Sequence, residues 1–95
     1  MIVAVMELHL ALYDNDSLKA KRSVVKRLTH RCRNTFNVSV SEVADQDSTD
    51  RATLGVAAVG PDARYLEGLL QKVEGFVERQ ALADVLEAPK HIETF

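Results

Sequence analysis

The chain has one cysteine, Cys32, among its 95 residues, so no disulfide can form within it. A lone cysteine is typical of a reducing compartment. The sequence also lacks an apolar run of the roughly 18 residues that a membrane-spanning helix needs. Its first residues, MIVAVMELHLALYD, contain no basic segment and alternate with polar residues, unlike a signal peptide. We therefore expect a cytoplasmic protein with no membrane partner.

The length predicts a single domain over residues 1–95. A chain of this size buries roughly 60–70% of its unfolded surface, which supports a two-layer core and little more. The apolar content of 46% and charged content of 27% are those of an ordinary globular domain. An isologous dimer that hides further apolar surface would suit so small a core.

Acidic residues are absent from positions 19–33, although the chain is acidic overall with a formal net charge of −2. This stretch holds seven of the twelve basic residues, namely Lys19, Lys21, Arg22, Lys26, Arg27, Arg31 and Arg33. The rest of the chain carries five basic and fourteen acidic residues, a net charge of −9. The sequence therefore predicts a molecule with its positive charge gathered in one segment.

Apolar residues at every even position predict a strand over residues 2–12. Asp14 to Ser17 form a predicted turn, in which Asp16 or Ser17 can cap a helix. The helical spacing of Leu18, Val25, Leu28 and Cys32 predicts that helix over residues 17–34. The first part of the chain is therefore a strand followed by a strongly basic helix.

The second part of the chain contains three predicted strands and one predicted helix. The predicted elements are a strand over 38–43, a polar hairpin loop over 45–50, a strand over 52–59, a helix over 62–80 with Pro61 at its first position, and a last strand from 84 onward. Pro89 interrupts the last strand and places it at a sheet edge. The order β-α-β-β-α-β predicts an α+β, ferredoxin-like sandwich, with a four-stranded antiparallel sheet and two helices on one face.

The basic helix has three open interpretations. It is a solvated surface, or its cations pair with Glu67, Glu74 and Glu78 of the second helix, or it binds an external polyanion. Cations in the first turn oppose the helix dipole, and the like-charged pairs Arg22/Lys26 and Arg27/Arg31 cost about 0.2–0.5 kcal/mol each. Such costs favour an external partner, of which nucleic acid is the commonest. The candidate phosphate contacts are Lys19, Lys21, Arg22, Lys26, Arg27 and Arg33, with Lys21 extending to solvent from the edge of the apolar stripe.

Aromatic residues are absent from the predicted open face of the sheet. The residues expected there are Val3, Val5, Glu7, His9, Thr53, Gly55, Ala57 and Val59. An RNA-recognition motif stacks bases on aromatic residues of its sheet, so base stacking is not expected here. Small and apolar outward residues favour a sheet-to-sheet or edge contact, and we predict a homodimer.

Signs of catalysis are weak. Glu7 and His9 share one strand face and could orient a metal ligand or act as a general base, but no third ligand lies near in sequence. Cys32 has basic neighbours that would lower its pKa, yet it lies on the apolar side of its helix. No phosphate loop, dinucleotide turn or nucleophile elbow is present. The sequence predicts no catalytic residue, no metal site and no small-molecule cofactor.

Several stretches together resemble the YlxP-like family of small bacterial domains of unknown function: LHL at 8–10, SLKAKRSVVKRL at 17–28, FNVSVSEV at 36–43, Gln46-Asp47 and RATLGVAAVG at 51–60. The resemblance implies a ferredoxin-like, cytoplasmic, dimeric protein. Genes of this family often lie beside translation initiation and ribosome-binding factors, which implies a ribosome or RNA role by association. Ala20 stands where the family usually has Glu, and Ser48 and Thr49 follow Gln46-Asp47 where it often has a large apolar residue.

We therefore predict a non-catalytic binding module that contacts RNA or the ribosome through its first helix. The competing class is a small regulatory or protein-interaction homodimer that uses the open sheet face and binds no nucleic acid. If six cations engage single-stranded RNA, log K is expected to fall against log salt with a slope of about −4.

Overall fold

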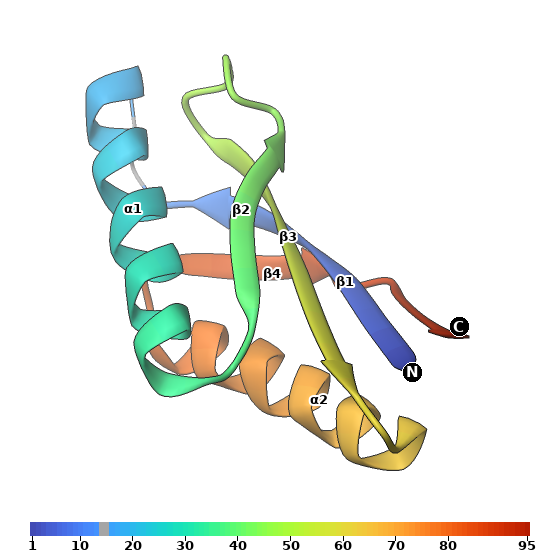
Figure 1. Cartoon of the computed structure of the whole chain (residues 1–95). Coiled ribbons are helices and arrows are strands. Elements are labelled where there is room, and N and C mark those ends of the chain that lie inside the picture. Colours follow the sequence, from blue (N-terminus) through green and yellow to red (C-terminus); the bar gives the residue numbers. More distant parts are fainter. Residues whose placement is uncertain (14–15) are drawn as a thin grey trace.

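A computed structural model describes residues 1–13 and 16–95, which form two helices and one antiparallel sheet of five strands (Figure 1). The elements in chain order are β1 Ile2–Leu12, α1 Leu18–Thr35, β2 Ser39–Ala44, β3 Arg51–Gly60, α2 Ala63–Arg79, β4 Ala83–Glu87 and β5 Lys90–Thr94. The strand order is β2-β3-β1-β4, with β5 also paired to β1. The predicted alternation of α and β elements is confirmed.

The sheet has five strands where four were predicted, because the last strand is divided at Ala88–Pro89. Proline has no N–H to donate to a strand ladder, and here the Pro89 carbonyl instead accepts from the Glu7 N–H at 3.0 Å. Both β4 and β5 pair with β1 alone, so they share one edge of the sheet. The predicted count is wrong, whereas the predicted edge position of this segment is confirmed.

The helices begin at side-chain caps. Ser17 is the N-cap of α1, and its hydroxyl accepts from the Ala20 N–H at 3.1 Å. The N-cap of α2 is Asp62, whose carboxylate accepts from the Arg64 N–H at 3.1 Å. Pro61 therefore precedes the cap, and the prediction that it opens the helix is wrong by two positions. Positions 14 and 15 of the predicted turn lie outside the described residues.

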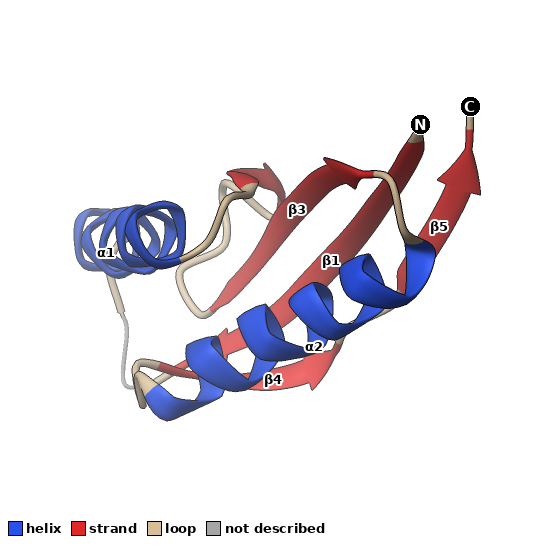
Figure 2. Ribbon diagram, turned by 60° about the horizontal axis from the view of Figure 1, so that its bottom comes forward, coloured by secondary structure: helices blue, strands red, loops and turns tan. Residues whose placement is uncertain are grey.

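The core lies between the helices and one face of the sheet. The even-numbered residues of β1 from Ala4 to Leu10 are at most 1% exposed, as their alternation predicts. They join Leu28 of α1 and the α2 stripe of Leu66, Leu70, Val73 and Val77 in one apolar cluster. Within the part of the chain that the structure describes, no helix covers the other face of the sheet (Figure 2). The fold therefore leaves two surfaces for function, the outer side of α1 and the open sheet face.

Candidate nucleic-acid interface

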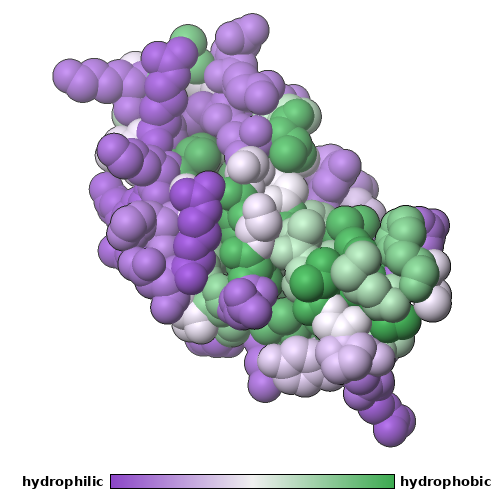
Figure 3. All heavy atoms as spheres, viewed as in Figure 1, coloured by the Kyte–Doolittle hydropathy of each residue, from purple (hydrophilic) through white to green (hydrophobic). Residues whose placement is uncertain are grey.

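Five of the six predicted phosphate contacts are exposed along α1. We call them the basic surface: Lys19, Arg22, Lys26, Arg27 and Arg33. Their helical spacing follows from the apolar stripe, which turns Val25, Leu28 and Cys32 to the sheet and leaves the cations facing outward. The hydrophilic spheres on the left of Figure 3 gather over α1. The structure thus brings these five cations together on one helix.

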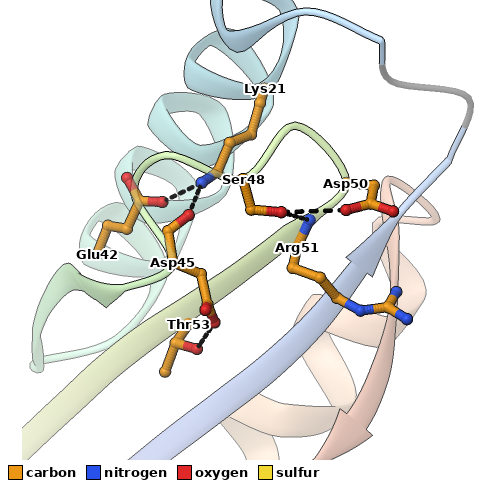
Figure 4. A network of polar contacts seen from close by, with 7 residues as sticks. All are labelled: Lys21, Glu42, Asp45, Ser48, Asp50, Arg51 and Thr53. Carbon is orange, nitrogen blue, oxygen red and sulfur yellow. Dashed lines mark hydrogen bonds and ion pairs between the residues drawn. The ribbon is translucent and has the colours of Figure 1, made fainter.

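Lys21 is the exception and corrects the prediction. Its side chain is fully buried, with Nζ 2.8 Å from Oε2 of Glu42, and Nζ also donates to the main-chain carbonyl of Asp45 (Figure 4). An ammonium group can be buried when an opposite charge and a hydrogen-bond acceptor replace its water. Lys21 therefore does not reach solvent, and we withdraw it from the phosphate contacts.

The partners of Lys21 belong to the hairpin between β2 and β3. Asp45 has a positive φ of 63°, a conformation that Asp adopts more readily than most residues. Its carboxylate accepts from the Thr53 hydroxyl at 2.7 Å, and its carbonyl accepts from the Ser48 N–H at 3.1 Å. These bonds hold the loop in one shape against the start of α1.

The polar loop continues the same network (Figure 4). The Ser48 hydroxyl donates to the Asp50 carboxylate at 3.0 Å and accepts from the Arg51 N–H at 3.1 Å. The sequence analysis missed this network, although two signals were present. Lys21 lies near the apolar side of its helix, and strand alternation places Glu42 on the inward side with Val40.

The proposed pairing between the two helices does not occur in residues 1–13 and 16–95. Glu74 instead forms an ion pair with Lys90 of β5 at 2.7 Å. Lys21 is the only described cation of α1 with a carboxylate within 4.0 Å. The guanidinium of Arg31 donates to the Gln80 side chain at 2.7 Å, and that of Arg33 donates to the Val40 carbonyl, both of which are uncharged acceptors. Among the described residues, no carboxylate therefore neutralises the basic surface through a direct ion pair.

Two Glu–His pairs lie on the strands. His9 Nε2 is 3.1 Å from Glu7 Oε1, and His91 Nε2 is 3.3 Å from Glu93 Oε1. The second pair was missed because β5 was not expected as a separate strand, although its spacing of two residues was the available signal. No group of three metal-ligating side chains occurs among the described residues. Each pair can orient an imidazole but forms no larger cluster.

Cys32 is fully buried on the inner side of α1, as its place in the apolar stripe predicts. Burial raises the pKa of its thiol from 9.0 to about 11, because a thiolate is poorly solvated in the core. Burial, and not the positive charge of the neighbouring residues, therefore decides the pKa of this thiol. The guanidinium groups of Arg31 and Arg33 donate to Gln80 and to the Val40 carbonyl, whereas Cys32 is buried in the core.

We expect Cys32 to resist an aromatic disulfide reagent in the folded protein at about pH 8 and to react fully in denaturant, because the thiolate is the reactive species. Labelling is followed by absorbance. Because folding raises the pKa of this thiol, its contribution to the free energy of unfolding is fully present below pH 9.0. That contribution is lost as the pH rises toward about 11. Rapid labelling of the folded chain would contradict the burial of this side chain.

Comparisons with known proteins found a matching family model, a related sequence and a similar solved structure. Residues 3–89 match a family model described as a protein of unknown function (DUF503). The chain is 40% identical over 77 residues to a Bacillus subtilis (strain 168) protein named "Uncharacterized protein YlxP", covering 81% of this chain and 84% of that protein. A solved structure titled "Structural Genomics, protein YJCS" superposes with a TM-score of 0.59 at 13% identity, over 94% of this chain and 96% of the other. That level of identity supports the fold alone. Neither described helix is both long and apolar enough to cross a membrane.

Proposed function

This chain belongs to the DUF503 family of proteins of unknown function, and we propose that it is a cytoplasmic, non-catalytic binding module that contacts RNA or the ribosome through α1. The strand order β2-β3-β1-β4 with two crossing helices supports a ferredoxin-like assignment within the α+β class. The single buried cysteine supports a reducing compartment.

The observation that carries the proposal is the unpaired charge of the basic surface. Its five cations are exposed, and no described carboxylate lies within 4.0 Å of them, in a chain of formal net charge −2. Lys19 lies in the first helical turn, where the dipole favours an anion. A phosphate backbone against α1 would place negative charge near the positive end of the helix dipole. It would also reduce the repulsion among the cations of the basic surface.

The test is a titration of single-stranded RNA at several salt concentrations. Five phosphate contacts predict a slope of log K against log salt of about −3.5. Cosedimentation with ribosomes in sucrose gradients is expected at low salt and is expected to disappear at high salt. Absence of RNA binding at low salt, measured by fluorescence anisotropy, would refute the proposal.

The second candidate is a regulatory or protein-interaction homodimer that binds no nucleic acid. The observation that favours it is the open sheet face, where Val5, Val43 and Val59 are exposed. Under this alternative the chain self-associates but remains at the top of the gradient at every salt concentration. The same cosedimentation experiment therefore separates the two candidates.

A further inference from the structure

Most of the basic surface forms a straight row along α1. Successive residues of a helix turn by about 100°, so four of its cations fall within about 60° of one another: Lys19, Arg22, Lys26 and Arg33. With a rise of about 1.5 Å per residue, this row extends over roughly 21 Å. Arg27 lies beside the row on one flank of the helix. A partner that contacts the whole row must carry negative charge along a similar length.

The row is held in place before any partner binds. Helix α1 has 18 residues and is capped by Ser17, and its inner side packs into the core through Leu28 and Cys32. The positions of the cations along the row are therefore set by the backbone of one packed helix. A partner whose phosphates are already ordered binds such a row at a lower entropic cost than a flexible strand, which must be ordered on binding.

The outer side of α1 offers little for base stacking. The helix contains no Phe, Tyr or Trp, and its one ring is the imidazole of His30. Proteins that bind single strands commonly stack successive bases on aromatic side chains. Arginine planes can also stack on bases, but each of these long side chains must first be ordered. A single strand on this row would therefore be held by its phosphates, without the stacking that usually adds to its affinity.

The aromatic side chains of the described residues belong to other parts of the fold. Phe36, at the C-terminal end of α1, packs against Phe76 of α2 with ring centroids 5.3 Å apart. The Tyr13 hydroxyl donates to the Asp84 carboxylate of β4 at 2.6 Å. The other two are Tyr65 of α2 and Phe95 after β5. No described Phe or Tyr therefore adds a stacking platform to the row.

Acidic residues border α1 on the side of the hairpin loop between β2 and β3. This loop carries the exposed Asp47 and Asp50, and the hydrogen bond from Lys21 to the Asp45 carbonyl holds it against the start of the helix (Figure 4). A flexible strand that wrapped around α1 toward the loop would meet like charge. The favourable approach is along the outer side of the helix, which a stiff polyanion contacts without bending.

We infer that the RNA bound by α1 is double-helical, an inference that rests on the proposed function. Double-stranded DNA has one negative charge per about 1.7 Å of its axis, twice the density of either strand, and an RNA duplex likewise presents two strands of phosphates. These phosphates are ordered before binding and the bases are already stacked on one another, so the duplex loses nothing where aromatic residues are lacking. Double-stranded RNA is recognised mostly through its shape and backbone, and backbone contacts are those that the row can make.

The inference is tested with an RNA duplex of about 16 base pairs, the length that a double-stranded-RNA-binding domain spans, and with one of its strands alone. Fluorescence anisotropy at one low salt concentration measures the affinity of the purified chain for each. We expect the duplex to bind at least roughly tenfold more tightly, since its doubled number of phosphates alone would give only about twofold. A strand that binds as tightly as the duplex would overturn the inference and leave the proposed function intact, whereas absence of binding to either would refute both.

His30→Trp tests the argument from stacking, because His30 is exposed and lies in line with the row. The added ring is expected to strengthen single-strand binding at least roughly fivefold and to leave duplex binding within about twofold. His30→Gln is the matched control, since it removes the imidazole without adding a ring, and is expected to change neither affinity by more than about twofold. Circular dichroism shows whether both variants fold. Unchanged single-strand affinity in folded His30→Trp would overturn the inference, because missing stacking would then not explain a preference for the duplex.

Discussion

Lys21→Ala is expected to lower the free energy of unfolding by about 3 kcal/mol, because it leaves the Glu42 carboxylate without its buried counter-charge. Removal of one member of a buried ion pair typically costs about 3–5 kcal/mol. The lower limit applies here, since the Glu42 side chain is 18% exposed and retains some contact with water. Urea denaturation followed by circular dichroism measures the change.

Lys26→Ala is the matched control, because Lys26 is an exposed lysine of the same helix. It is expected to change stability by less than about 0.5 kcal/mol. The double variant Lys21→Met/Glu42→Leu removes both charges and is expected to recover most of the loss. If Lys21→Ala costs no more than Lys26→Ala, the buried pair does not stabilise the protein.

The same substitution also releases the hairpin loop. The Lys21 ammonium donates to the carbonyl of Asp45, whose conformation at φ 63° begins the loop. Without that donor, the Ser48 and Arg51 amides are expected to exchange hydrogen faster, because their acceptors lie within this loop. A lysine in the most basic segment of the chain is thus part of the core rather than part of the basic surface.

Local patterns predicted much of the fold because they reflect contacts along one element. The even-numbered apolar residues of β1 fix which side of the strand is buried, and Ser17 marks the start of α1. The number of strands was harder to predict. Pro89 signals an edge, but only the pairing of β4 and β5 with the same strand shows that it divides the segment in two.

The candidate site, like the fold, was predictable from the sequence where it depends on one element alone. The exposed cations Lys19, Arg22 and Lys26 follow from helical spacing alone. The burial of Lys21 depends on Glu42 and on a hairpin that begins more than twenty residues later, which no local pattern contains. A long side chain at the edge of an apolar stripe can extend to solvent or turn inward, and here the inward choice depends on a counter-charge from a different element.

The triple reversal Lys19→Glu/Arg22→Glu/Lys26→Glu is expected to weaken RNA binding at least roughly a hundredfold, because each charged contact contributes about 1.5 kcal/mol or more and each reversal adds repulsion. The helix is expected to persist, since an acidic residue in its first turn suits the helix dipole. Arg64→Glu/Lys72→Glu/Arg79→Glu on α2 changes the net charge by the same amount at another exposed surface. RNA affinity of the two variants is compared at one salt concentration by fluorescence anisotropy. Equal losses would assign binding to the overall charge of the molecule, whereas a loss confined to the α1 variant assigns it to the basic surface.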